Sequence, residues 1–240
     1  MNFLKTVLYI SIVLLLGQSC DEVKKGYKAG YEDATKAMEE TSSTDADKIP
    51  GWHIYNKTGV SAAWEIDDDG VISFDKSRGE GGDLVTNEEY ENFEMTLDWK
   101  ISDCGNSGIF WNIVESKEYG APYLTAPEMQ VLDNKCHPDA KIVTHRAGDL
   151  YDMIETSVVN VKPAGEWNSI KIRSENASMT FWQNDEEIVS FKMHDANWDA
   201  MVAKSKFKDW DAFGKATKGK IGLQDHGDKV WFKNINITRL

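Results

Sequence analysis

The fold is decided by a run of eight residues in which apolar and polar side chains alternate: Phe93-Glu94-Met95-Thr96-Leu97-Asp98-Trp99-Lys100. Successive side chains of a β-strand point to opposite faces of a sheet, so the run predicts a strand with one buried face. Similar short runs recur through the chain, at residues 63–67, 71–74, 107–114, 128–132, 167–173, 178–183 and 187–191.

Turn-forming residues separate these runs. Asp68-Asp69-Gly70 and Gln183-Asn184-Asp185 each lie between two predicted strands, as expected for antiparallel hairpins. The sequence therefore predicts an all-β fold, a two-sheet antiparallel sandwich of the jelly-roll type. Residues 196–219 break the pattern, and we expect them to form a partly helical excursion at one rim of the sandwich.

The C-terminal part begins with Lys220-Ile221-Gly222-Leu223-Gln224-Asp225-His226-Gly227. Alternation predicts a strand that buries Ile221 and Leu223 and presents Gln224 and His226 on the other face. A turn at Gly227 would return the chain as a second strand over residues 230–237, in a hairpin-like ending.

The first 48 residues have a different composition. Residues 1–19 carry Lys5, an apolar run over residues 7–16 and then small or polar residues, a pattern typical of a secretory signal and too short for a membrane span. Cys20 follows directly, as in bacterial lipoprotein signals, and predicts lipidation. Residues 20–48 are polar and predict a tether. We expect one folded domain over residues 49–240 and a lipid-anchored protein of the cell envelope, periplasmic or on the outer membrane.

Charge and aromatic content limit the function classes. A net charge of −13 and a sequence pI near 4.8 leave no basic patch for nucleic acid. The nine tryptophans suit a sugar ligand, because an aromatic ring stacks on the C–H face of a sugar. We expect Trp99 and Trp167 to lie in the core, and Trp111 is left open between core and ligand.

Polar clusters at strand ends supply the candidate site. Glu128 and Gln130 share one face of their strand, opposite Met129 and Val131, and a buried face of this kind is costly unless it binds something. The candidate catalytic residues are Glu128, His145 and His226, and the candidate substrate-binding residues are Asn106, Trp111, Gln130, Asp133, Tyr151, Gln224 and Asp225.

The order and spacing of these motifs resemble the 3-keto-disaccharide hydrolase domain family over most of residues 51–240. The motifs are Gly51-Trp52, Asn106-Ser107-Gly108, Glu128-Met129-Gln130-Val131-Leu132-Asp133-Asn134, His137-Pro138-Asp139-Ala140, Ala147-Gly148-Asp149-Leu150-Tyr151-Asp152, Gly165-Glu166-Trp167-Asn168 and Ile221-Gly222-Leu223-Gln224-Asp225-His226-Gly227. The resemblance implies a concanavalin-like jelly roll, cleavage of glycosides oxidised to a ketone at sugar C3, and a functional link to a sugar 3-dehydrogenase.

The number of carboxylates bears on the chemistry. Retaining glycosidases use two carboxylates about 5–5.5 Å apart, whereas Glu128 is alone on its predicted strand face. A C3 ketone instead permits removal of the C2 proton and elimination of the C1 aglycone, for which His145 or His226 is the candidate base. A divalent metal held by Glu128, Gln130, His145 and His226 stays open, because the spacing fits no tight ligand motif.

Two other function classes remain open: a non-catalytic, lectin-like carbohydrate-binding module, and an ordinary glycoside hydrolase.

Two cysteines, Cys104 and Cys136, flank strands that we expect to pair, and an oxidising exterior would permit a disulfide between them.

Overall fold

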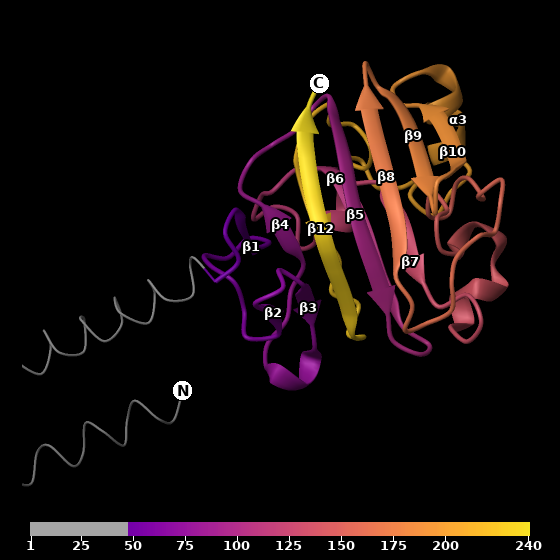
Figure 1. Ribbon diagram of the computed structural model, residues 1–240. Helices are drawn as coiled ribbons and strands as arrows, with labels where there is room; N and C mark the ends of the chain where they lie inside the picture. Colours follow the sequence, from indigo (N-terminus) through magenta and orange to yellow (C-terminus); the bar gives the residue numbers. More distant parts are fainter. Residues whose placement is uncertain (1–47) are drawn as a thin grey trace, which may run out of the picture. The chain divides into compact units, whose positions relative to one another are not determined.

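The computed structural model describes residues 48–240, which form two packed antiparallel sheets (Figure 1). One sheet has five strands in the order β1-β4-β11-β6-β7, and the other has seven in the order β10-β9-β8-β5-β12-β3-β2. The strands are β1 (Trp52–Ile54), β2 (Trp64–Ile66), β3 (Ile72–Phe74), β4 (Leu84–Thr86), β5 (Phe93–Ile101), β6 (Asn106–Ile113), β7 (Glu128–Leu132), β8 (Asn168–Glu175), β9 (Ser178–Gln183), β10 (Glu186–Lys192), β11 (Lys220–Leu223) and β12 (Val230–Arg239). The all-β, jelly-roll-type sandwich expected from the sequence is confirmed.

Strand β5 shows why the alternating pattern works. Phe93, Met95, Leu97 and Trp99 are buried in the core between the sheets, and the residues between them are half-exposed on the outer face. Its neighbours β8 and β12 pair with it along nearly its whole length. Burying four large apolar side chains on one face fixes the register, because a one-residue slip would turn all of them to water.

The expected C-terminal hairpin is wrong. β11 pairs with β4 and β6 in the five-stranded sheet, whereas β12 pairs with β3 and β5 in the other sheet. The strand also ends at Leu223, so His226 lies in the connection that crosses between the sheets. Sequence neighbours here are not sheet neighbours, and the pattern of alternation alone does not distinguish a hairpin from a crossing.

Two tryptophans differ from their expected or open positions. Trp167 precedes β8, whose inward residues are Asn168, Ile170 and Ile172, so its side chain lies on the outer face and not in the core. Trp111, which was left open, is buried in the core, and its ring packs edge-on against Phe181.

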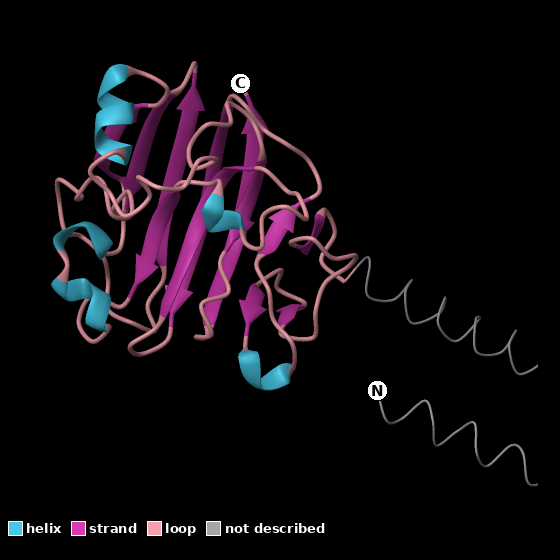
Figure 2. Ribbon diagram, turned by 180° about the vertical axis from the view of Figure 1, so that it is seen from behind, coloured by secondary structure: helices cyan, strands magenta, loops and turns pink. Residues whose placement is uncertain are grey.

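Short helices and long connections gather on the side of the five-stranded sheet (Figure 2). They include the 3₁₀ helices η2 (Pro122–Leu124), η3 (Pro138–Lys141) and η4 (Val143–His145), and the α-helix α3 (Ala196–Val202). The 3₁₀ helix η1 (Lys76–Arg78) instead lies in the connection from β3 to β4, at the bottom edge of Figure 2. The expected excursion at 196–219 is therefore helical only in its first third, with Asp195 capping the helix by accepting a hydrogen bond from the Trp198 amide.

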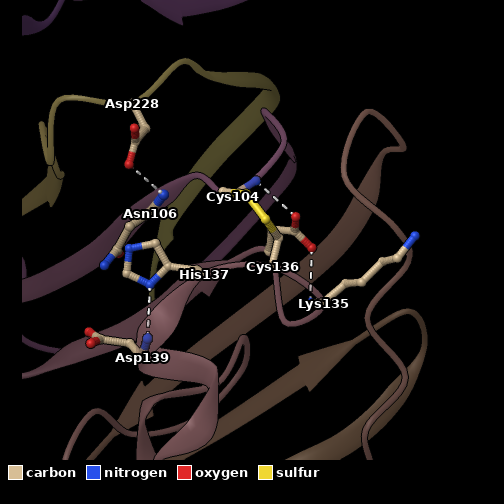
Figure 3. Close-up of a disulfide and its surroundings, with 8 residues drawn as sticks. Cys104, Asn106, Lys135, Cys136, His137, Asp139 and Asp228 are labelled. Atoms are coloured by element: carbon tan, nitrogen blue, oxygen red, sulfur yellow. Dashed lines mark hydrogen bonds between the residues drawn. A yellow bond between two sulfur atoms is a disulfide. The ribbon is translucent and has the colours of Figure 1, made fainter.

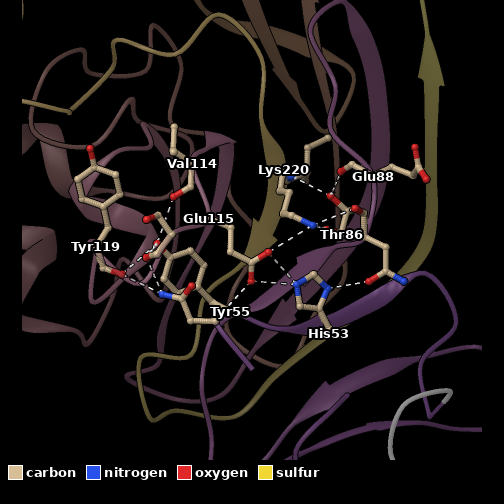
Figure 4. Close-up of polar contacts among 12 residues, drawn as sticks. His53, Tyr55, Thr86, Glu88, Val114, Glu115, Tyr119 and Lys220 are labelled. Atoms are coloured by element: carbon tan, nitrogen blue, oxygen red, sulfur yellow. Dashed lines mark hydrogen bonds and ion pairs between the residues drawn. The ribbon is translucent and has the colours of Figure 1, made fainter. Parts of the chain in front are cut away.

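A polar network attaches the short edge strand β1 to the connection that follows β6 (Figure 4). His53 contacts Asn87 through one ring nitrogen (2.7 Å) and Glu115 through the other (2.9 Å). The backbone amide of Asn56 also donates to Glu115, and Lys220 lies 3.4 Å from it. These contacts give a three-residue strand more anchorage than its backbone pairing alone.

The expectations for residues 1–47, namely the signal peptide, the lipidated Cys20 and nearly all of the tether, lie outside the described residues. Within residues 48–240 the structure has no helix of the length and apolarity that a membrane crossing requires.

Candidate functional site

A pocket of ≈ 180 Å³ lies on the outer face of the five-stranded sheet. Its floor comes from β6, β7 and the end of β11, and its walls come from the long connections around them. The lining residues are Asn106, Tyr123, Ala126, Glu128, Gln130, Tyr151, Lys206, Phe207, Trp210, Gln224 and His226.

Strand β7 supplies the centre of the floor. Met129 and Val131 are buried in the core between the sheets, while Glu128 and Gln130 point into the pocket, so the expected strand parity is correct. In the amide orientation that its neighbours allow, Gln130 donates hydrogen bonds to the Ser107 carbonyl (3.1 Å) and to Glu128 Oε1 (3.0 Å). Gln130 therefore fixes the position of the carboxyl group.

Gly108 on β6 makes room for that carboxyl group. It pairs with Gln130 in register, and a Cβ atom added at Gly108 would overlap the Glu128 carboxyl, with Cδ only 2.6 Å away. No other residue type leaves this space. Gly108 of the Asn106-Ser107-Gly108 motif thus belongs to the site because its missing side chain leaves room for the Glu128 carboxyl group.

Burial controls the charge of Glu128. The carboxyl lies in a low-dielectric surrounding, which raises the pKa of Glu128 to about 8, against a smaller opposing effect of the Lys206 ammonium. Asp83, which accepts a hydrogen bond from the Asp225 backbone amide, also has a pKa raised by burial, to about 7. Among residues 48–240, Glu128 is the only carboxylic acid that lines the pocket, and it holds its proton at pH 7.

The excursion after α3 forms one wall, which the sequence reading did not place at the site. It contributes Lys206, Phe207 and Trp210. The Lys206 ammonium lies 4.0 Å from the centre of the Tyr151 ring, and burial lowers its pKa. A lysine set among aromatic residues in a segment too long for a turn was the available signal. It was used to predict a rim excursion and not a pocket wall.

Tyr151 separates His145 from the pocket. The His145 ring lies against the Tyr151 ring at 4.2 Å, and its Nε2 contacts Asp152 Oδ1 at 2.9 Å. The other oxygen of Asp152 accepts a hydrogen bond from the Lys206 backbone amide. His145 is buried and does not line the pocket, so its role as the catalytic base is not supported. It instead supports Tyr151 and the Lys206 wall.

Asn106, Gln224 and His226 add further polar groups to the pocket, and two of these groups have no partner within residues 48–240. Asn106 Oδ1 and Gln224 Oε1 are buried and accept no hydrogen bond within the described part of the chain. His226 is exposed at the pocket edge, 6.2 Å from the ring of His137. Buried acceptors without donors are costly, and a ligand with hydroxyl groups would supply the missing donors.

Two further residues expected to contact the ligand do not line the pocket. Asp133 accepts hydrogen bonds from the Cys104 and Lys135 amides, and Asp225 accepts them from the Gly82 and Gly227 amides. Both carboxylates therefore hold loops together and do not line the pocket. Trp111 is likewise excluded as a substrate contact, because its side chain faces the core.

The disulfide partners lie beside the site (Figure 3). Cys104, before β6, is joined to Cys136, after β7. The link holds the loop of His137 next to Asn106, whose backbone amide donates to Asp228.

The four residues expected to bind a divalent metal are not brought together, because His145 is engaged behind Tyr151 while Glu128, Gln130 and His226 line the pocket. Within the described chain, the one trio of His, Cys, Asp or Glu donors within 4.8 Å is Cys104, Asp133 and Cys136, and its cysteines are bonded to each other. The expected metal set therefore does not fit, and no step below uses it.

Comparisons with known proteins show the family and the fold. A family described as the 3-keto-alpha-glucoside-1,2-lyase-like domain matches residues 39–238. The chain belongs to this family. It is 39% identical, over 223 residues, to a 3-keto-disaccharide hydrolase of Bacteroides thetaiotaomicron, covering 82% of this chain and 77% of the relative.

Solved structures show the same fold. One from Parabacteroides distasonis, provisionally named a glycosyl hydrolase, is 33% identical with a TM-score of 0.73, covering 80% of this chain and 90% of its own. A second from that organism, with the same provisional name, is 23% identical with a TM-score of 0.61, covering 79% of this chain and 99% of its own. At that identity the second likeness concerns the fold alone.

Proposed function

We propose that the protein cleaves glycosides whose sugar carries a ketone at C3, with elimination of the C1 aglycone followed by addition of water. The observation that carries this proposal is that Glu128 is the single carboxylic acid lining the pocket among residues 48–240. Burial raises the pKa of Glu128 to about 8, which favours its protonated form at neutral pH. Two-carboxylate hydrolysis needs a second acidic group on the same pocket, and the described residues offer none there.

Membership of the family and the likeness to a 3-keto-disaccharide hydrolase support a carbohydrate-active enzyme. The polar and aromatic groups of the pocket also support a sugar ligand. Asn106 and Gln224 present acceptors for sugar hydroxyl groups, and Trp210 and Tyr123 present ring faces at 5.8 Å from each other. We take the substrate to be a small glycoside or a disaccharide.

In the proposed mechanism His226 removes the C2 proton, because it is the histidine that lines the pocket. The electron pair of the C2–H bond forms an enolate with the C3 carbonyl. Glu128 donates a hydrogen bond to the enolate oxygen, and the Lys206 ammonium stabilises its charge. The enolate then expels the aglycone oxygen from C1, which takes up a proton, and leaves an enone.

Water completes the reaction. Its oxygen adds to C1 of the enone and a proton returns to C2, so the net change is hydrolysis of the glycosidic bond. His226, protonated in the first half, can supply the proton for the aglycone and then accept one from the water. Gln130 keeps Glu128 in place throughout, through its hydrogen bond to Oε1.

The proposed substrate must come from an earlier oxidation step. A 3-keto glycoside arises by oxidation of a C3 hydroxyl, so a sugar 3-dehydrogenase must supply the substrate. We further propose that Cys20 is lipidated and that the lipid alone tethers the protein to the cell envelope. A Cys20→Ser variant should then move from the membrane fraction to the soluble fraction.

The decisive experiment uses matched substrates in deuterated water: one 3-keto glucoside and its unoxidised parent. We expect cleavage of the keto substrate alone, with one deuterium at C2 of the product. A control with product and no enzyme measures spontaneous exchange at C2. Product without deuterium at C2 would contradict elimination and would indicate direct displacement at C1. Cleavage of the parent would indicate an ordinary glycosidase, and binding without cleavage a lectin-like module.

A further inference from the structure

Three tryptophans of the described chain belong neither to the core nor to the pocket. Trp52, Trp64, Trp99, Trp111 and Trp198 are buried in the core, and Trp210 lines the pocket. The other three are half-buried on the outer face of the seven-stranded sheet: Trp167, Trp182 and Trp231. The outer face of an antiparallel sheet is ordinarily polar, so three such rings on one face need an explanation.

Each ring carries a lysine on its face. The Lys100 ammonium lies 4.7 Å from the Trp231 ring and 4.8 Å from the Trp167 ring, and Lys233 lies 4.2 Å from Trp167. Such contacts stabilise the cation without neutralising it.

The second cluster pairs Lys171 with Trp182, in register across β8 and β9, at 3.9 Å. Within residues 48–240, none of the three lysines has a carboxylate within 4.0 Å. These cations are thus gathered on one face of a chain whose net charge is −13.

A groove of ≈ 440 Å³ runs along this face. Its polar floor includes Thr96, Asp98 and Ser169, and Trp182 and Lys171 form one side. Asp98 is already engaged, because it accepts a hydrogen bond of 2.7 Å from Asn234 at the bulge in β12. The other acidic residue of the groove, Asp185, lies in the turn between β9 and β10.

The groove includes the Lys171–Trp182 cluster, and the cluster of Lys100, Trp167 and Trp231 lies on the same face outside its lining. One lies at the level of Lys100 and the other at the level of Thr96 on β5, four residues or ~13 Å apart. A single sugar ring cannot contact both clusters, whereas an extended chain can. Figure 1 views this face, and no helix or connection crosses in front of β12, β5 and β8.

We propose that this outer face is a second binding site, for an acidic polysaccharide whose sugar rings carry carboxylates. Lys100, Lys171 and Lys233, which the tryptophan rings hold in place, take the carboxylates, and the hydroxyl groups that line the groove take hydroxyl groups of the sugars. The site lies on the sheet opposite the pocket, so it holds the enzyme on a polymer without taking part in cleavage.

The groove favours a polysaccharide over an anionic membrane. Membrane binding requires apolar side chains that project into the lipid, whereas these rings are half-buried and covered by ammonium groups. The hydroxyl groups of Thr96 and Ser169 in the floor suit hydrogen bonds to sugar hydroxyls and have no partner in an acyl chain.

The test is electrophoresis of the protein through native gels containing polygalacturonate, amylose or no polymer, with co-sedimentation on phosphatidylglycerol vesicles in parallel. The charge of −13 repels the protein from any polyanion, so retention by polygalacturonate would report a local site. We expect retention in polygalacturonate alone, weakened at least tenfold in Trp182→Ala and in Lys100→Met/Lys233→Met. Activity on the 3-keto substrate should be unchanged in both variants, because neither alters the pocket.

The control is Glu128→Gln, which alters the pocket and should bind polygalacturonate as the wild type does. The proposal is overturned if polygalacturonate does not retain the wild type, if amylose retains it equally, or if only the vesicles bind. It is also overturned if both variants, folded by circular dichroism, are retained as strongly as the wild type. Each of these results leaves the proposed cleavage reaction untouched.

Discussion

The outer faces of the two sheets are built from the same strand geometry but are covered differently. On the five-stranded sheet, three long connections, residues 114–127, 133–167 and 193–219, each contribute side chains to the pocket. On the seven-stranded sheet, β8, β9 and β10 are joined by two-residue turns that stay at the edge and leave the face open.

The connections that cover the five-stranded sheet change the protonation and hydrogen bonding of the groups beneath them. Under the connections, Glu128 is buried and holds its proton, and two amide oxygens lack partners. On the open face the lysines are half-exposed and lie on aromatic rings. A polar group on these strands has a shifted pKa or lacks a hydrogen-bond partner where a connection shields it from water. The strand geometry alone does not produce either effect.

The largest expected effect is on the covered face. His226→Ala should lower kcat on a 3-keto glucoside by roughly 10²–10⁴-fold, the usual cost of losing a general base. The fold should persist because His226 is exposed. The matched control is His137→Ala, whose ring lies 6.2 Å away and does not line the pocket. Equal losses in the two variants would argue that the loop, and not the base, was damaged.

The second effect is steric. Gly108→Ala should displace the Glu128 carboxyl, because the new methyl group would occupy its place. A misplacement of about 1 Å can cost ~10²-fold in rate, and we expect a loss of that order in kcat/KM. Gly120→Ala is the control, since a Cβ atom there meets nothing within 4 Å. Full activity of Gly108→Ala would remove Glu128 from the mechanism.

The third effect is on pH dependence. The pKa of Glu128 is raised to about 8, so its proton is lost, and the rate should fall, as pH rises through that value. Because the pKa is raised by folding, its contribution to stability is complete below about pH 4.5 and is lost as pH rises through about 8. Glu128→Gln should therefore flatten the alkaline fall in kcat/KM and be more stable than wild type at pH 9.

Asp83 complicates the stability measurement, because its pKa is raised to about 7 and has the same sign. Asp83→Asn is therefore measured in parallel, by urea denaturation at pH 6 and pH 9. An alkaline fall in rate that persists in Glu128→Gln but disappears in Asp83→Asn would assign it to Asp83.

The sequence predicts the open face better than the covered one. Alternation placed β5, β9 and β10 of the open face within a residue or so of their observed bounds, because strand parity is a local property. On the covered face it placed β7 equally well. It also predicted that Glu128 and Gln130 point away from the core. It did not find the short strands β1 and β4, whose three residues are too few to show a period.

The residues of the covering connections were the ones misjudged. Whether a histidine in a long connection reaches the pocket depends on its neighbours in space, such as Tyr151 in front of His145. Lys206 was missed because nothing in its local sequence shows that the excursion folds over β7. Asp133 and Asp225 looked like ligand contacts, but loop amides occupy both oxygens of each.

The smallest expected effect is on the open face, where Lys100→Met should lower the free energy of unfolding by about 1 kcal/mol. Lys100 lies between Trp167 and Trp231, and each exposed cation–π contact contributes about 0.5–1 kcal/mol. Methionine keeps an apolar stem against the rings, so the difference isolates the charge. Lys57→Met is the control, because its ion pair with Glu80 is exposed and should contribute little. Urea denaturation of both variants measures the difference. If the two variants have the same midpoint of urea unfolding, Lys100 does not stabilise the open face. The position of the lysines on the tryptophan rings would then need a ligand to explain it.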